Sequence, residues 1–156
     1  MSKILVSACL LGCKVRYDGN DLPVDNDAFT KVIAAHEIIS FCPEVAGGLS
    51  TPRIAAEICG GVGSDVLEGK AKIMGKDGSD VTAPFIKGAQ LALQICQENN
   101  IKRAILTESS PSCGSGTIYN GKFAGDKIKG QGVTCAILEK HGIKVVSQYG
   151  AAEFIN

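Results

Sequence analysis

Several features that would indicate particular classes of protein are missing from this 156-residue sequence. No apolar run approaches the roughly 18 residues that a membrane-spanning helix needs. The 16 acidic and 16 basic residues give a net charge of zero, which argues against a nucleic-acid surface built on bulk charge and leaves only a local basic patch open. The chain has no tryptophan, internal repeat, low-complexity segment or linker. These absences predict one domain over residues 1–156, with no membrane segment.

Cysteine is the residue that the sequence has in excess, because seven are present. A secreted scaffold held by disulfides is normally shorter and has an even number of cysteines. We therefore predict reduced thiols in a cytoplasmic protein, with some of the cysteines acting as ligands or catalytic groups. The stretch from Ile4 to Cys13 also resembles a lipoprotein signal, but its apolar part is at the short end for one, and a buried strand fits it as well.

Apolar runs and turn residues alternate along the chain as they do in α/β proteins. The predicted strands are at 3–7, 37–41, 103–107 and 143–147. The predicted helices between them are a short one at 28–35, a long one at 82–99, and one from Gly130-Gln131-Gly132 to Lys140. Strands that alternate with helices pair in parallel, so we expect a Rossmann-like, three-layer α/β/α fold with a mainly parallel sheet.

Turn residues predict shorter elements between these strands and helices. Thr51 followed by Pro52 is typical of a helix start, which predicts a helix from there to Gly60-Gly61. Two small β-hairpins should be added to the main sheet. They are predicted over 66–80, around Asp77-Gly78, and over 117–123, around Asn120-Gly121.

Cys9, Cys42 and Cys113 each follow a predicted strand. The carboxyl ends of parallel strands meet at one edge of a sheet, where ligands collect, so these cysteines should converge there. Soft thiolates select iron–sulfur clusters, zinc or copper(I). The chain lacks the C-x-x-C pair that structural zinc sites usually have. The spacing leaves open a [4Fe-4S] cluster with one iron free of protein, a zinc site, a thiol nucleophile, and cysteines that are only buried.

Four motifs occur in order around these cysteines and at the last predicted helix. They are Cys9-Leu10-Leu11-Gly12 with Arg16-Tyr17-Asp18-Gly19, Cys42-Pro43-Glu44 with Gly47-Gly48-Leu49 and Thr51-Pro52-Arg53, Ser110-Pro111-Ser112-Cys113-Gly114, and Gly130-Gln131-Gly132-Val133-Thr134. Together they resemble the thiouracil desulfidase family, a domain family formerly of unknown function, over nearly the whole chain.

The resemblance implies that Cys9, Cys42 and Cys113 bind a [4Fe-4S] cluster. It also implies a catalytic glutamate two residues after the second ligand, which is Glu44. A catalytic serine should stand just before the third ligand. Ser110 is preferred for that role over Ser112.

Two positions depart from the family pattern. The family often has a lysine a few residues before the Ser-Pro-Ser-Cys-Gly motif, where this chain has Thr107. A second proline is common after Pro52-Arg53, where this chain has Ala55. Both departures leave the ligands intact and bear on the identity of the substrate more than on the chemistry.

The activity that the resemblance implies is the removal of sulfur, without net redox change, from a thiolated pyrimidine of the 2-thiouracil or 4-thiouridine type. The soft thiocarbonyl sulfur should bind the open iron, Glu44 could deprotonate the attacking water, and Ser110 could position that water or donate to the ring. Sulfide and the oxygenated base are the products. Residues that could contact the substrate ring or a phosphate are Arg16, Tyr17, Asp18 and Arg53.

The expected partner is therefore a small thiolated nucleobase or nucleotide, with a thiolated tRNA a less favoured substrate. The chain should be a monomer or a homodimer. Two other functions stay open at this point: a non-catalytic iron–sulfur or redox-sensing protein, and a zinc-dependent nucleobase hydrolase.

Overall fold

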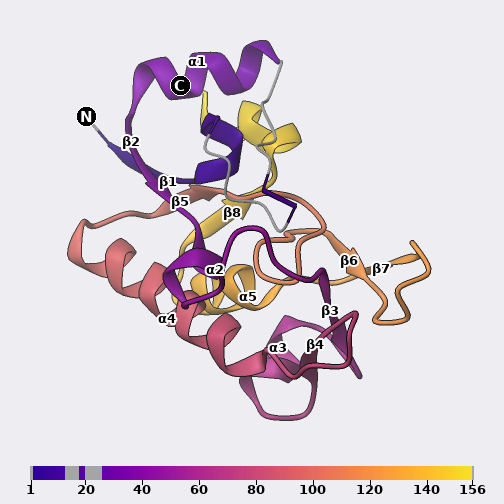
Figure 1. Ribbon diagram of the computed structural model, residues 1–156. Coiled ribbons are helices and arrows are strands. Elements are labelled where there is room, and N and C mark those ends of the chain that lie inside the picture. The colour runs from indigo at the N-terminus through magenta and orange to yellow at the C-terminus, as the bar shows by residue number, and fades with distance from the viewer. Residues whose placement is uncertain (1, 13–17, 20–25, 156) are drawn as a thin grey trace.

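A four-stranded parallel sheet forms the centre of the computed structural model, which describes residues 2–12, 18–19 and 26–155 (Figure 1). The strands are β1 (Lys3–Ser7), β2 (Glu37–Phe41), β5 (Arg103–Ile105) and β8 (Lys144–Val146). Their order in the sheet is β2-β1-β5-β8, and every pair is parallel. The predicted parallel sheet is confirmed, and the strand that precedes Cys9 lies between the strands that precede the other two candidate ligands.

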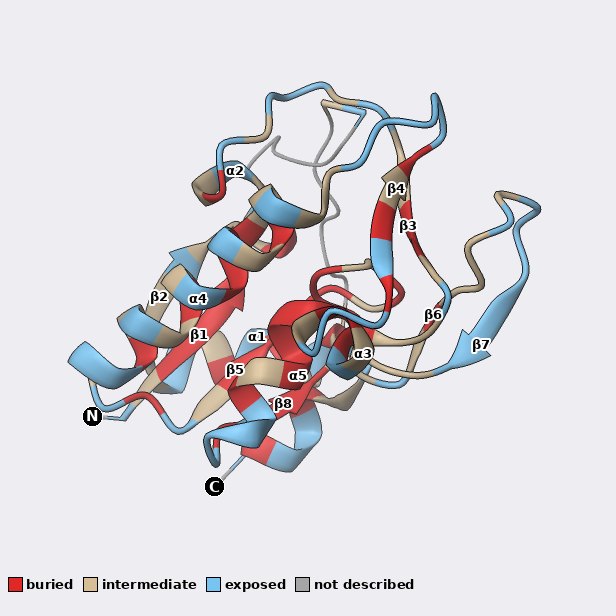
Figure 2. Ribbon diagram, turned by 90° about the horizontal axis from the view of Figure 1, so that it is seen from below, coloured by how far each residue is buried: buried red, intermediate tan, exposed pale blue. Residues whose placement is uncertain are grey.

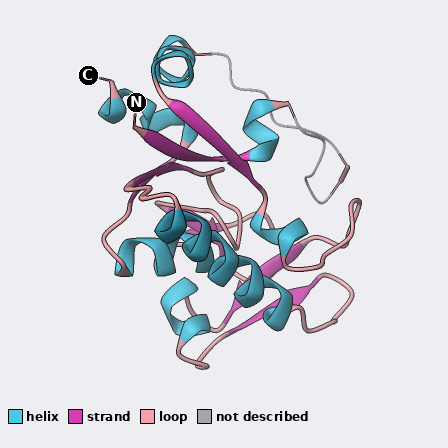
Figure 3. Cartoon of the chain, turned by 90° about the vertical axis from the view of Figure 1, so that its left-hand side faces the viewer, coloured by secondary structure: helices cyan, strands magenta, loops and turns pink. Residues whose placement is uncertain are grey.

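Helices cover both faces of this sheet (Figures 1 and 3). On one face lie α4 (Thr82–Glu98) and α5 (Val133–Lys140); on the other lie α1 (Asp27–Ala35) and the 3-10 helices η1 (Ala8–Leu11) and η2 (Gln148–Phe154). The expected three-layer α/β/α arrangement is confirmed. Among the described residues, no helix has the length and apolarity that crossing a membrane requires.

Alternation along β1 explains why the sheet takes helices on both faces. Successive side chains of a strand point to opposite faces. Leu5 packs in the cluster with α4 and α5, whereas Ile4 and Val6 pack in the cluster with α1 and η2. All three side chains are fully buried, and Figure 2 shows the buried residues concentrated on the central strands and on the helix surfaces that face them.

Two antiparallel pairs extend the fold beside the main sheet. They are formed by β3 (Ala56–Cys59) with β4 (Lys72–Gly75), and by β6 (Thr117–Tyr119) with β7 (Lys127–Lys129). The short helices are α2 (Pro43–Ala46) and α3 (Gly63–Leu67). The predicted small β additions are thus present, although their boundaries differ from those expected.

The predicted helix from Thr51 to Gly60-Gly61 is wrong, because its second half is strand β3. Ile58 in β3 pairs with Ile73 in β4, and both side chains are buried in the cluster with α3, α4 and α5. A strand's partner and its burial outweigh a local capping signal. The hairpin predicted over 66–80 begins later than expected, since α3 extends to Leu67 and the first strand is β4, whereas the turn at Asp77-Gly78 is present.

The second hairpin is wider than predicted. Its strands are 117–119 and 127–129 rather than a tight pair around Asn120-Gly121. The Glu57 carboxylate of β3 accepts the backbone N–H groups of Gly121 (2.9 Å) and Phe123 (3.2 Å). This buried side chain holds the connecting segment against β3, which explains why the chain does not close into a two-residue turn.

Helix α2, which carries Glu44, lies directly on α4 because glycines allow the backbones to touch. A Cβ atom at Gly88 would lie 1.9 Å from the Pro43 carbonyl oxygen, and one at Gly47 would lie 2.0 Å from the Pro84 carbonyl oxygen. No side chain fits at either contact. The two glycines therefore fix the position of the segment that follows β2.

We expect Gly88→Ala to lower the free energy of unfolding by about 1–3 kcal/mol, because the added methyl group overlaps the Pro43 carbonyl. In a solvent-exposed helix the same change would raise the free energy of unfolding by up to about 1 kcal/mol, so the sign of the change distinguishes the two situations. Urea unfolding measures this free energy. Gln90→Ala, on the exposed side of α4, should stay within about 0.5 kcal/mol of the parent chain. A Gly88→Ala chain that is more stable than the parent would contradict the close packing.

Candidate functional site

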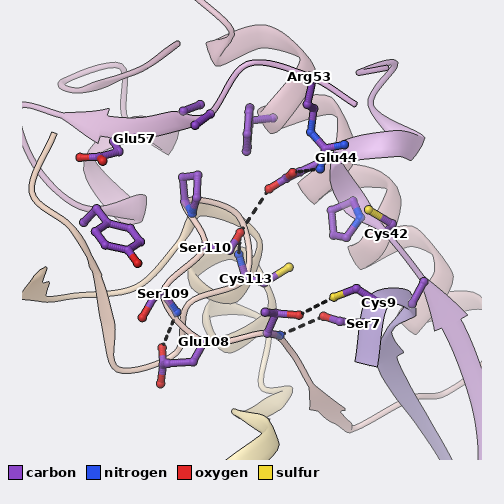
Figure 4. A pocket seen from close by; sticks show the side chains of 18 of the residues that line it. Ser7, Cys9, Cys42, Glu44, Arg53, Glu57, Glu108, Ser109, Ser110 and Cys113 are labelled. Carbon is purple, nitrogen blue, oxygen red and sulfur yellow. Dashed lines mark hydrogen bonds and ion pairs between the residues drawn. The ribbon is translucent and has the colours of Figure 1, made fainter. Parts of the chain in front are cut away.

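The three candidate ligands line one cavity at the carboxyl edge of the sheet (Figure 4). Cys9 lies in η1, immediately after β1, and Cys42 directly follows β2. Cys113 lies in the loop that follows β5. Because β2, β1 and β5 are neighbours in the sheet, the segments that leave them meet at this edge. The predicted convergence is observed, while their role as ligands stays a prediction.

The cavity is small and has largely apolar walls. Its volume is about 280 Å³. The apolar wall residues include Phe41, Pro43, Ile54, Phe85 and Pro111. Ligand pockets commonly combine such walls with a few placed polar groups, and here the polar groups are on the Cys42–Glu44 segment and on the loop after β5.

Ser110 and Glu44 face each other across the cavity. The Ser110 hydroxyl accepts the backbone N–H groups of Ser112 (3.1 Å) and Cys113 (3.2 Å), so its oxygen is used as an acceptor. Its proton is donated to Oε1 of Glu44, at 3.2 Å (Figure 4). The serine thus shapes the turn that carries Cys113 and also contacts the carboxylate.

Arg53 binds the other oxygen of the Glu44 carboxylate. The guanidinium also donates to the Ser50 carbonyl (3.1 Å) and to the Thr51 hydroxyl (3.2 Å). Its side chain is 7% exposed, and that of Glu44 is 14% exposed. The pair fixes the orientation of the Glu44 carboxylate toward the cavity.

Ser112, the second candidate for the catalytic serine, does not line the cavity. It is fully buried, and its hydroxyl bonds that of Thr134 at 2.6 Å. The Ser112 carbonyl also accepts the Thr134 N–H at 2.8 Å, at the start of α5. Ser112 therefore anchors the cysteine loop to α5, and of the two predicted serines only Ser110 reaches the cavity.

The Gly130-Gln131-Gly132 segment packs against the loop that carries Cys113. A Cβ atom at Gly132 would lie 2.5 Å from the Ser112 carbonyl group, so a side chain there would push the loop away. The Gly132 N–H donates to the Gly114 carbonyl at 2.8 Å. The glycine motif thus permits a close contact between the start of α5 and the cysteine loop.

Glu108 organises the rest of the loop that follows β5. Its Oε1 accepts backbone N–H groups at 3.0–3.3 Å, and the donors are Ser109, Ser115, Gly116 and Thr117. Burial opposes the ionisation of this carboxyl, but the N–H groups outweigh burial and lower the pKa of Glu108. One carboxylate thereby satisfies several backbone donors that the loop would leave unpaired.

The electrostatics of the cavity suit a cationic centre. Burial raises the pKa of the Cys113 thiol well above its ordinary value, and the neighbouring charges of Glu44, Cys42 and Cys9 raise it further. Burial also raises the pKa of Cys42. Thiolates that surround one cavity together with a carboxylate repel one another. A positively charged group between the sulfurs would relieve that repulsion.

The donor set fits an iron–sulfur cluster. The cysteines that the structure describes are all free thiols, so none of the three cavity sulfurs is tied up in a disulfide. Thiolates are the ligands that such clusters take. Within the described ranges, no group of three His, Cys, Asp or Glu side chains is placed to hold a single metal ion.

The residues predicted to contact substrate are only partly placed. Arg53 borders the cavity, where it binds Glu44. Asp18 is exposed and borders a shallow groove next to the cavity, together with Arg53 and Lys76. Arg16, Tyr17 and the unassigned Cys13 lie outside the described residues.

Sequence reasoning missed several residues that line the cavity. Thr107, noted only as a departure from a family pattern, bonds Cys9 at 3.0 Å. The sequence pattern predicts a helix at Glu57 and a tight hairpin at Tyr119 and marks neither as a site residue, yet both line the cavity. The position of Thr107, at the end of the predicted strand 103–107 and shortly before the candidate ligand Cys113, is a signal that could have identified it.

Fold and site together define an α/β protein that gathers soft thiolate donors at the carboxyl edge of a parallel sheet. A family model described as 2-thiouracil desulfurase matches residues 4–149, and the chain belongs to this family. The resemblance seen in the sequence is thereby confirmed.

Two proteins illustrate the relationship. The uncharacterized protein YbbK of Bacillus subtilis (strain 168) is 48% identical over 145 residues, which cover 93% of this chain and 95% of that protein. A solved structure named [4Fe-4S]-dependent thiouracil desulfidase TudS has 46% sequence identity and a TM-score of 0.86. The match covers 98% of this chain and 95% of that chain.

We expect Ser112→Ala to lower the free energy of unfolding by about 1–3 kcal/mol, because it leaves the buried Thr134 hydroxyl without its partner. The double variant Ser112→Ala/Thr134→Val removes both hydroxyls and should cost less than the sum of the two single changes. A double-mutant cycle by urea unfolding tests this. Strictly additive costs would contradict the pairing.

Glu108→Gln should destabilise the chain in a pH-dependent way. The pKa of Glu108 is lowered from its ordinary 4.5 on folding, so its stabilisation is present above pH 4.5 and is lost as the pH falls through the lower folded value. The difference in unfolding free energy between parent and variant should therefore be largest near neutral pH and shrink in acid. Urea unfolding at a series of pH values measures it, and a difference that stays constant would contradict the assignment.

Proposed function

We propose that this chain is a [4Fe-4S]-dependent thiouracil desulfidase that converts a thiocarbonyl of a pyrimidine into a carbonyl. The observation that carries the proposal is that Cys9, Cys42 and Cys113 line one cavity together with the hydrogen-bonded pair Glu44 and Ser110. Membership of the 2-thiouracil desulfurase family and the match to TudS support it.

In this proposal Cys9, Cys42 and Cys113 hold the cluster. When bound, the cluster supplies an iron that no protein side chain ligates and that accepts a soft sulfur atom. The chain brings these cysteines together because the three strands that precede them are neighbours in the sheet. Figure 4 shows the three sulfur-bearing side chains around the same cavity.

Glu44 acts as the general base in the proposed reaction. Its carboxylate lies in the cavity, and Arg53 holds one of its oxygens, which keeps the other directed toward Ser110. A water placed between this carboxylate and the substrate would lose a proton to Glu44 as its oxygen bonds to the thiocarbonyl carbon. Water and the thiolated base thus give the oxygenated base and hydrogen sulfide, with no change in oxidation state.

Ser110 positions the reacting groups. Two backbone N–H groups fix its oxygen, and its proton points at Glu44. When a substrate enters, the same hydroxyl can orient the attacking water or donate to an atom of the ring. A hydroxyl that is held in this way loses little freedom on binding, which favours a productive geometry.

The size and walls of the cavity favour a small substrate. A volume of about 280 Å³, part of which a cluster would fill, leaves room for a planar pyrimidine. Phe85 and the two prolines of the wall provide apolar surface for its faces. We therefore infer a free base or a small nucleotide rather than a thiolated tRNA, for which the net charge of zero offers no general attraction.

The proposal also covers the localisation, domain organisation and oligomeric state of the enzyme. Free thiols at every described cysteine agree with a reducing compartment, so we place the protein in the cytoplasm. The family match over residues 4–149 supports one desulfidase-like domain over the chain. We expect a monomer or a homodimer.

Anaerobic purification followed by iron and acid-labile sulfide assays tests the cofactor, and sulfide release from 2-thiouracil tests the activity. We expect a brown protein with equal amounts of iron and sulfide that releases sulfide from the free base. A colourless, zinc-containing protein would overturn the proposal in favour of a zinc hydrolase. A brown protein that releases no sulfide from free thiolated bases or nucleotides would favour a sensing role.

We expect Glu44→Gln to lower the rate of sulfide release by at least about 100-fold while iron content is retained, because the amide cannot take the proton from water. Ser110→Ala should also lower the rate. Glu68→Gln, an exposed carboxylate paired with Lys70, is the matched control and should keep full activity. Full activity in Glu44→Gln would remove Glu44 from the mechanism.

Alanine substitution of Cys9, Cys42 or Cys113 should abolish the visible absorbance and the bound iron, because each removes a thiolate from the cavity. Cys59→Ala is the control, since Cys59 lies outside the cavity and its thiol faces the Gly121 carbonyl at 3.5 Å. We expect that variant to retain iron and sulfide at the level of the parent. Loss of the cluster only in Cys59→Ala would contradict the proposed ligand set.

A further inference from the structure

We propose that Thr107 is a positioning residue for the cluster: its hydroxyl donates a hydrogen bond to the Cys9 sulfur and thereby protects the bound cluster against oxidative loss. The inference rests on the proposed function, because it requires Cys9 to be a ligand. It goes beyond that function by assigning a role to a cavity residue that is not one of the proposed cluster ligands.

The contact is short and buried. Thr107 Oγ1 lies 3.0 Å from Cys9 Sγ, and both residues are 8% exposed. The Thr107 backbone N–H donates to the Ser7 hydroxyl at 3.0 Å. Ser7 is the last residue of β1, so Thr107 is attached to the same strand end from which Cys9 projects.

The fold holds these two residues in register although they are 98 positions apart. Strands β1 and β5 are paired in parallel up to Val6 and Ile105. The next backbone bond in the same region joins the Leu106 N–H to the Val146 carbonyl at 2.9 Å, which continues β5 toward Thr107. Thr107 lies just beyond the end of β5, and these backbone hydrogen bonds to Val146 and Ser7 hold it at the edge of the sheet.

The direction of the Thr107–Cys9 hydrogen bond is fixed once the Cys9 sulfur binds iron. In the free thiol, either Cys9 or Thr107 can be the donor. A thiolate bound to iron has no proton, so it can only accept, and the Thr107 hydroxyl must then donate. Cluster binding therefore fixes the orientation of this hydroxyl.

A hydrogen bond to a ligand sulfur draws electron density away from it and stabilises the more reduced form of a cluster. Oxidative loss begins when one electron passes from the cluster to dioxygen. A donor at Cys9 makes that transfer less favourable, which suits an enzyme whose reaction involves no net electron transfer. Second-shell donors of this kind also orient the ligands that they contact.

The test compares reconstituted holoenzymes with Thr107→Val and Thr107→Ser. Valine keeps the shape of threonine without the hydroxyl, whereas serine keeps the hydroxyl. We expect Thr107→Val to shift the midpoint potential of the cluster to more negative values and to speed the bleaching of its visible absorbance in air by about 10-fold. Thr107→Ser should restore both properties to near those of the parent.

Thr82→Val is the matched control. It also removes a partly buried threonine hydroxyl with a backbone partner, the Ile73 N–H at 2.9 Å, but it does not line the cavity. Its potential and bleaching rate should equal those of the parent. This separates a local effect on the cluster from a general loss of stability.

Two results would overturn the inference. An unchanged potential and bleaching rate in Thr107→Val would show that the hydroxyl does not act on the cluster, and equal defects in the valine and serine variants would assign the effect to packing. Either result leaves the proposed function standing if the parent holds a cluster and releases sulfide. If the parent itself binds no iron, the proposed function and this inference both fail.

Discussion

The parallel pairing of β1 with both β2 and β5 is the constraint on which the site depends. The segment that leaves the carboxyl end of each of these strands carries one cysteine, and neighbouring parallel strands bring these three segments to one place. The buried side chains of β1, on both of its faces, hold it at this position between two helix layers. A different strand order would separate Cys9, Cys42 and Cys113 even if every local element formed.

Contacts between backbones and buried polar groups then set the fine geometry. The glycine contacts between α2 and α4 fix the Cys42–Glu44 segment, and those at the start of α5 fix the loop that carries Cys113. Glu108 and Ser110 bind backbone N–H groups of that same loop. These contacts define the positions of both segments without a bound ligand, which is the kind of support that pre-organised binding requires.

Local patterns predicted the elements whose signals are strong. The apolar runs at 3–7 and 37–41 and the periodic stretch from Thr82 are found as expected, because an apolar run of strand length and a regular helical period are strong local signals. The segment after Thr51 was mispredicted as a helix. Pairing with β4 and burial of Ile58 in a separate apolar cluster stabilise a strand there. This stabilisation outweighs the helix-capping preference of Thr51 and Pro52.

The sequence by itself determined that three cysteines would follow three strands and that the motifs around them belong to a family of thiouracil desulfidases. It also placed Glu44 and a serine near them. Only the tertiary structure decided that Ser110 faces the cavity while Ser112 anchors the loop, that Arg53 binds Glu44, and that Thr107 contacts Cys9. The physical reason is that such contacts join residues of different segments, from 9 to 98 positions apart in the chain. They depend on strand order, register and backbone approach, which no local pattern encodes.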